Sequence, residues 1–103
     1  MKEHRLVRPR QEQQHERALF EAILALRTLD DCRSFFRDLC TPAEIQALAD
    51  RWAVVEYLER GVPYREIHQL TGVSVTTIGR VARFLTSGHG GYRTVRERLK
   101  ESA

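Results

Sequence analysis

Apolar side chains recur every three or four residues along most of this chain, which is the spacing of one face of an α-helix. The first such segment spans residues 11–29. Four apolar residues then stand at i, i+3, i+4 and i+7: Cys32, Phe35, Phe36 and Leu39. They predict a second, short helix with Asp30 or Asp31 as its N-cap. We find no strand pattern and no internal repeat, so the chain is expected to be all-α.

The clearest helix start is the segment Thr41-Pro42-Ala43-Glu44, which is a capping box with proline in the first turn. Five apolar residues continue the helical spacing: Ile45, Leu48, Trp52, Val55 and Leu58. Gly61 is expected to end this helix. Three further side chains widen its apolar face beyond what one neighbouring helix covers: Trp52, Val54 and Tyr57. That excess predicts an interface.

Two short helices follow, at residues 64–70 and 75–86, with Pro63 before the first and Ser74 as N-cap of the second. A glycine turn joins them, which is typical of a helix-turn-helix whose second helix lies in the DNA major groove. Its predicted core is Ile67, Gly72, Val73, Ile78 and Val81. Gly72 is expected to be left-handed. His68 stands where a small residue is usual, which predicts a wider crossing of the two helices.

The polar residues of this segment are the predicted DNA contacts: Arg65, Ser74, Thr76, Thr77, Gly79, Arg80 and Arg83. Arginine can bond guanine O6 and N7 together, and threonine offers a hydroxyl and a methyl group. Gly79 would allow a close approach to the groove, and Arg65 would hold a phosphate. In the alternative interpretation the second helix only packs within a bundle, and its threonines form a solvated face.

Charge is distributed unevenly along the chain. Residues 60–100 hold eight Lys or Arg against two Glu, a net +6, whereas the whole chain carries +3. Arginine outnumbers lysine fifteen to two. Residues 1–10 resemble a mobile basic arm ahead of a single helical domain at 11–103, and Tyr92, Val95 and Leu99 mark a last, basic helix. This distribution indicates a polyanionic partner.

The segment TPAEIQALADRWAVVEYLERGVPYREIHQLTGVSVTTIGRVARFL resembles the central block of the Trp repressor family. The shared features are the capping box, a long helix ending in RG, a first helix containing RE, and a T-I-x-R second helix. The resemblance covers about residues 15–100. It implies a six-helix, intertwined homodimer with two helix-turn-helix units one DNA turn apart, roughly 34 Å, on a palindromic operator of double-stranded DNA.

The resemblance also implies a site where the repressor holds free tryptophan between two arginines. The matching residues here are Arg51 and Arg80, with Thr41 and Thr77 at the matching threonine positions. Val81 and Phe84 replace a glycine and a serine and would fill the space of the ligand. We therefore predict a vestigial pocket formed by Thr41, Arg51, Arg80, Val81 and Phe84. Tryptophan is then not the co-repressor, and no cofactor is expected.

Two alternatives remain for this pocket. Phe84 can act as a built-in aromatic plug, or a different and smaller effector can bind. If the pocket is vestigial, Arg51 is expected to pair with Glu56 or Glu59.

Other function classes are disfavoured by the sequence. The four histidines have no paired metal spacing, and no nucleophile lies beside a plausible base, which argues against an enzyme. Cys32 and Cys40 lack CxxC spacing and are expected to be reduced thiols, with a disulfide or a metal site as the alternative. The remaining rival is a helical, dimeric adaptor for a protein of the transcription machinery.

No apolar run approaches the roughly 20 residues of a membrane span, and the first residues lack the apolar segment of a signal peptide. We therefore expect a bacterial cytoplasmic transcription regulator, a repressor, associated with the nucleoid through DNA.

Overall fold

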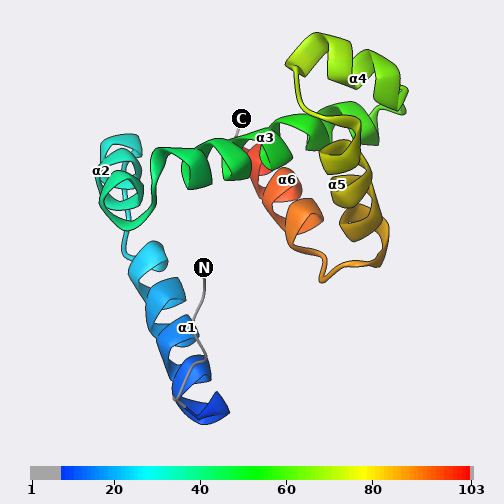
Figure 1. The fold of residues 1–103 in the computed structure, drawn as a ribbon. Coiled ribbons are helices and arrows are strands. Elements are labelled where there is room, and N and C mark those ends of the chain that lie inside the picture. Colours follow the sequence, from blue (N-terminus) through cyan, green and yellow to red (C-terminus); the bar gives the residue numbers. More distant parts are fainter. Residues whose placement is uncertain (1–7, 103) are drawn as a thin grey trace. The chain divides into compact units, whose positions relative to one another are not determined.

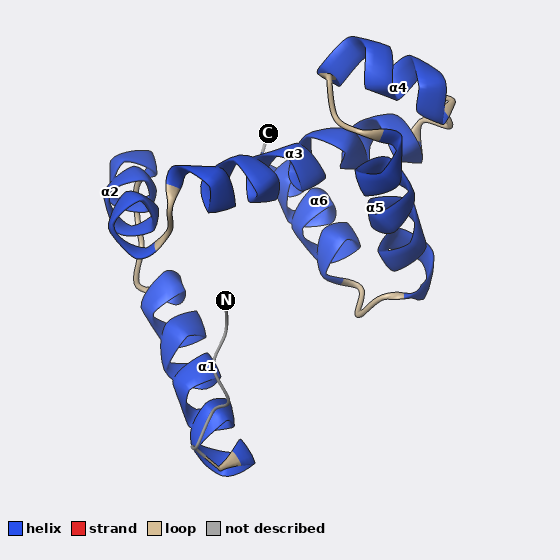
Figure 2. Ribbon diagram, in the orientation of Figure 1, coloured by secondary structure: helices blue, strands red, loops and turns tan. Residues whose placement is uncertain are grey.

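The computed structural model describes residues 8–102, which form six helices and no strand (Figures 1 and 2). The helices are α1 (Pro9–Leu24), α2 (Leu29–Leu39), α3 (Pro42–Glu59), α4 (Tyr64–Thr71), α5 (Val75–Ser87) and α6 (Gly91–Ser102). The all-α prediction is confirmed. Contacts within the chain group the residues up to Cys40 into one compact unit and those from Thr41 onward into another. The single domain at 11–103 stays a prediction.

The boundaries of α1 differ from those predicted. Pro9 and Arg10, assigned to the basic arm, form the first turn of α1, and the backbone N–H of Arg8 donates to Gln11 Oε1 (3.0 Å). The rest of the arm, residues 1–7, lies outside the described residues. The helix predicted over 11–29 is also too long, because α1 ends at Leu24.

The break between α1 and α2 comes from a cap that the apolar pattern hides. Thr28 is extended (φ −132°, ψ 164°), and its Oγ1 accepts a hydrogen bond from the backbone N–H of Asp31 (2.9 Å). Asp31 in turn accepts from the backbone N–H of Arg27 (3.0 Å). The predicted cap at Asp30 or Asp31 is therefore wrong. Thr28 satisfies the free amide at the start of α2, and both aspartates lie in its first turn.

Neither α1 nor α2 contains a buried side chain. Leu24 is 83% exposed and Leu29 66% exposed, and Phe20 and Leu39 are also exposed. Cys32 and Cys40 are free thiols. Within one chain, the apolar positions of this unit therefore lack the cover that normally stabilises an amphipathic helix.

The capping box that begins α3 is confirmed. Thr41 Oγ1 accepts from the backbone N–H of Glu44 (3.1 Å), and the Glu44 carboxylate accepts from that of Thr41 (2.8 Å). Two of the amide groups that a helix start leaves unpaired are thus satisfied. α3 ends at Glu59, two residues before Gly61, which was predicted to end the helix and takes a positive φ of 75°.

The core of the second unit forms where α3, α4 and α5 pack on one another (Figure 1). Its buried residues are Val54, Val55, Ile67, Val73, Ile78 and Val81. Of the three side chains predicted to widen the apolar face of α3, Trp52 is 37% exposed, whereas Val54 and Tyr57 provide no surplus surface, and the interface itself stays a prediction. Val54 is fully buried within the unit and Tyr57 packs against the same core, because α3 meets two other helices rather than one.

The turn between α4 and α5 has a left-handed Gly72 (φ 78°), as predicted. The exposed ring of His68 fits here because its Nδ1 lies 2.7 Å from the carbonyl oxygen of Val73. Thr71 completes the turn: its hydroxyl donates to the carbonyl of Ile67 (2.7 Å) and accepts from the backbone N–H of Val73 (3.1 Å). The Thr71 hydroxyl thereby satisfies the backbone N–H of Val73, which lies beyond the end of α4.

α6 is attached to α3 through two side-chain contacts. Tyr92 stacks on Trp52, with ring centroids 6.2 Å apart and an interplanar angle of 29°. Arg96 Nε donates to Glu59 Oε1 at 2.9 Å. The last, basic helix is thus present and docked on the long helix of its unit.

Candidate nucleic-acid interface

α5 has two chemically different faces. Ile78 and Val81 point into the core and are almost fully buried. On the opposite side, four residues line a surface hollow: Thr76, Gly79, Arg80 and Arg83. The structure therefore brings together four of the seven predicted DNA contacts on one side of this helix. Arginine and threonine side chains on an exposed helix face have the donors and acceptors that base edges and phosphates require.

Two other predicted contacts, Ser74 and Thr77, serve the start of α5. Ser74 Oγ accepts from the backbone N–H of Thr77 (3.1 Å) and donates to the Thr77 hydroxyl (3.0 Å). Arg65, the seventh, is exposed in the first turn of α4 and does not line the hollow.

The two arginines of α5 share one aromatic partner. The Cζ atoms of Arg80 and Arg83 both lie 5.1 Å from the centroid of the Phe84 ring. This distance falls within the range of cation–π attraction. None of the ion pairs described for residues 8–102 involves either arginine.

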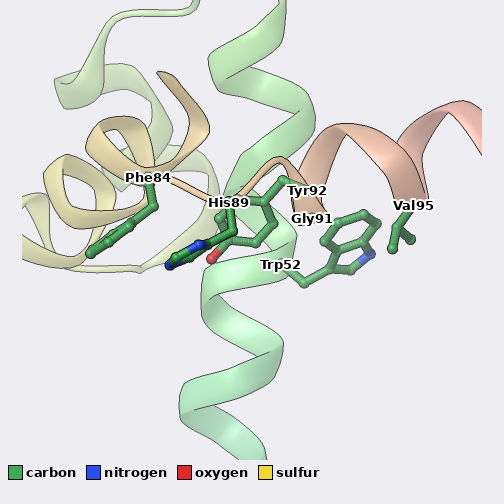
Figure 3. Close-up of a pocket in the computed structure, with 6 residues that line it drawn as sticks. All are labelled: Trp52, Phe84, His89, Gly91, Tyr92 and Val95. Carbon is green, nitrogen blue, oxygen red and sulfur yellow. The ribbon is translucent and has the colours of Figure 1, made fainter. Parts of the chain in front are cut away.

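Phe84 also lines an open apolar groove of about 460 Å³ (Figure 3). Trp52 enters it from α3, and Tyr92 and Val95 enter it from α6. His89 and Gly91, from the α5–α6 connection and the start of α6, complete the lining. The sequence pattern did not reveal this groove, because its residues come from positions up to 43 apart (52 to 95) and share no local motif.

The five residues of the predicted vestigial pocket line no common hollow within the described part of the chain, and the pocket stays a prediction. Thr41 is engaged in the capping box, and Val81, only 1% exposed, belongs to the core. Of the five predicted residues, Phe84 alone lines the apolar groove, and it contacts Arg80. Val81 points inward with Ile78, as its predicted place in the core requires, whereas Arg80 lines the exposed hollow.

The predicted ion pair of Arg51 is also wrong. Glu56 pairs with Arg60 (3.3 Å) and Glu59 with Arg96 (2.9 Å). Both carboxylates that were predicted as partners of Arg51 therefore pair with other arginines. Arg60 also lies over the Tyr57 ring, at 5.4 Å.

Metal-ligand clusters and membrane-spanning helices were also sought in the part of the chain that is described. Within residues 8–102, no three His, Cys, Asp or Glu side chains gather as metal ligands would. No described helix combines the length and apolar character needed to cross a bilayer.

Comparisons with known proteins agree with this architecture. Residues 14–100 match the family model described as Trp repressor protein. The chain is 45% identical to the uncharacterized protein YerC of Bacillus subtilis (strain 168) over 84 residues, which cover 82% of this chain and 81% of that protein.

Two crystal structures are similar as well. One, titled as a TrpR like protein from Eubacterium eligens ATCC 27750, has a TM-score of 0.81 and 44% identity, covering 84% of this chain and 90% of that one. The other, from Staphylococcus aureus, has a TM-score of 0.80 and 40% identity, covering 84% and 86%. Family match, identity and fold agree: this chain belongs to the Trp repressor family, whose fold is that of DNA-binding regulators rather than of enzymes.

Proposed function

We propose that this protein is a sequence-specific transcription regulator, a repressor, that inserts α5 into the DNA major groove. The observation that carries the proposal is the two-sided character of α5. Its inner face is buried in the core, and Thr76, Arg80 and Arg83 line one exposed hollow. A helix fixed from behind and equipped with guanidiniums and hydroxyls in front matches the requirements for reading base edges.

The proposal assigns different contacts to different residues. Arg80, Arg83 and Thr76 read base edges, and Gly79 lets the backbone of α5 approach the groove. Ser74 and Thr77 hold the start of α5, where backbone amides and the helix dipole favour a phosphate. Arg65 on α4 contacts the DNA backbone and so adds affinity without sequence preference.

The working form is proposed to be a homodimer on a palindromic site. The support is the exposed apolar surface of α1 and α2, where Leu24 and Leu29 are 83% and 66% exposed and no side chain is buried. Uncovered apolar surface of this kind is typical of an interaction site, and a second copy supplies the same surface in return. Such a dimer would act where the DNA is, in the bacterial cytoplasm.

Tryptophan is not the proposed co-repressor. Arg80, which matches an arginine that flanks the indole in the repressor, already has the Phe84 ring beside its guanidinium. Val81, at the position of the repressor's glycine, belongs to the core. An internal aromatic partner on Arg80 would compete with an added indole, so binding to DNA should not depend on tryptophan.

The test is selection from random double-stranded DNA by the purified protein at about 100–150 mM salt, where charge alone binds weakly. Parallel selections contain or lack tryptophan. An enriched palindrome recovered equally from both supports a dimeric regulator without this co-repressor. Enrichment that requires tryptophan contradicts the proposed independence, and a lack of any enrichment favours an adaptor that binds protein instead.

A further inference from the structure

Phe84 connects the two surfaces described above. Its half-buried side chain lines the apolar groove together with Trp52 and Tyr92 (Figure 3). The same ring lies 5.1 Å from the guanidinium carbons of both Arg80 and Arg83. One side chain thus contacts both arginines of the exposed hollow and also lines the apolar groove between α3, α5 and α6.

The contact of the two guanidiniums with an aromatic ring, unlike an ion pair, leaves their hydrogen-bond donors available. An aromatic face attracts a cation through its quadrupole and needs no N–H group in the guanidinium plane. A carboxylate partner would accept those N–H bonds, which are the ones that guanine or phosphate uses. The ion pairs within residues 8–102 involve Arg17, Arg33, Arg60 and Arg96, not the two arginines of α5.

The contact also restricts two long side chains. Arg80 and Arg83 stand three residues apart on α5, so their like charges face the same side of the helix. A free arginine side chain has many rotamers, and ordering them on binding lowers affinity. Attraction to a shared ring offsets part of the repulsion and reduces the number of rotamers before any ligand arrives.

We propose that Phe84 is a positioning residue of the DNA-reading surface, which holds the Arg80 and Arg83 guanidiniums in place with their donors free. This inference rests on the proposed function. It also explains why independence from tryptophan is expected: the chain carries its own aromatic ring at the arginine that is otherwise placed beside a ligand.

The test compares Phe84→Leu with Phe84→Tyr. Leucine keeps an apolar side chain in the groove but has no aromatic face, whereas tyrosine keeps the ring. The DNA probes are the sequence enriched by the wild-type protein and a scrambled duplex of equal length. Phe84→Leu is expected to weaken binding to the enriched sequence roughly threefold to tenfold. Binding to the scrambled duplex should be unchanged, and Phe84→Tyr should restore wild-type preference.

A second measurement needs no DNA and separates positioning from general loss of structure. The side-chain Nε–Hε NMR signals of Arg80 and Arg83 in the free protein should show ring-current shifts in the wild type and in Phe84→Tyr, and lose them in Phe84→Leu. Backbone signals of α5 beyond the immediate neighbours of residue 84 should stay in place in all three proteins.

The outcomes are distinguishable. Wild-type preference retained in Phe84→Leu overturns this inference alone, as do arginine signals that are not shifted in the wild type. An equal loss of binding to both duplexes in Phe84→Leu overturns it too, because a positioning role acts on the enriched sequence only. If the wild-type protein enriches no sequence, the proposed function fails and this inference fails with it.

Discussion

The Nε of Arg96 on α6 lies 2.9 Å from Oε1 of Glu59 near the end of α3. Both side chains are largely shielded from solvent, with exposed fractions of 21% and 27%. A second acidic residue on α3 offers a natural comparison: Glu56 pairs with Arg60 one turn away, and those side chains are 54% and 59% exposed. Shielding determines how much each pair stabilises, because solvent weakens an exposed ion pair.

Replacing Glu59 with alanine should therefore loosen α6. We expect a loss of about 1 kcal/mol in the free energy of unfolding. Hydrogen exchange of the α6 amides should accelerate, because the Trp52–Tyr92 stack is then the main remaining link to α3. Glu56→Ala is the matched control and should change the exchange of α6 little. Equal effects of the two variants would show that the Glu59–Arg96 pair does not hold α6.

Gly88 is required by the way in which α5 ends. A Cβ atom added there would clash with the carbonyl oxygen of Phe84. The backbone N–H of Gly88 bonds that same carbonyl at 2.9 Å, so the clash and the helix end involve one group. Gly88→Ala should lower the free energy of unfolding by roughly 1–3 kcal/mol, as substitutions with backbone strain do.

The control for that variant is Gly91→Ala. An added Cβ at Gly91 meets no atom within 4 Å, and the residue begins α6. Its replacement should leave stability unchanged or raise it slightly, because alanine favours helix. The melting temperatures of the Gly88→Ala and Gly91→Ala variants are compared by thermal unfolding. Similar melting temperatures would contradict the predicted steric conflict at Gly88.

A substitution at Gly79 is expected to change the stability of the fold and its affinity for DNA in opposite directions. It is helical, and an added Cβ would lie at an ordinary 3.9 Å from Cε2 of Tyr64. Gly79→Ala should therefore stabilise the fold by about 0.5–1 kcal/mol through helix propensity. If α5 approaches DNA closely at this residue, the same variant should bind the enriched sequence more weakly. Higher stability with unchanged DNA affinity would remove Gly79 from the proposed contact surface.

Local signals in the sequence predicted most of the second unit. The capping box at Thr41, the N-cap at Ser74 and the turn at Gly72 each depend on residues within three or four positions of one another, so the sequence predicts them directly. The start of α2 was missed although Thr28 and Asp31 carry a similar signal. Apolar residues continue at helical spacing through Leu24, Leu26 and Leu29, and this pattern concealed the cap.

Contacts between distant residues could not be predicted in the same way. Glu59 and Arg96 are 37 positions apart, and several other arginines were equally plausible partners. The apolar groove likewise depends on how α6 returns to α3, which brings Tyr92 onto Trp52. Phe84 was predicted as a plug because it stands where the repressor family has a smaller serine. Its position beside two guanidiniums required the rotamers of three side chains, which a spacing pattern does not specify.

The proposed division between base reading and backbone contact is tested by two arginines. Arg80 lines the exposed hollow of α5, whereas Arg93 is an exposed cation in the first turn of α6. Arg80→Ala should weaken binding to the enriched sequence by about 1–3 kcal/mol and broaden the selected motif at one position per half-site. Arg93→Ala should weaken binding to all sequences about equally. It should also reduce the salt dependence of binding, because about one counterion fewer is released for each phosphate contact that is lost.

Binding titrations at several salt concentrations, combined with repeated selection, measure both effects. If both variants lose affinity equally for every sequence, α5 contributes charge without reading bases, and the protein binds DNA nonspecifically.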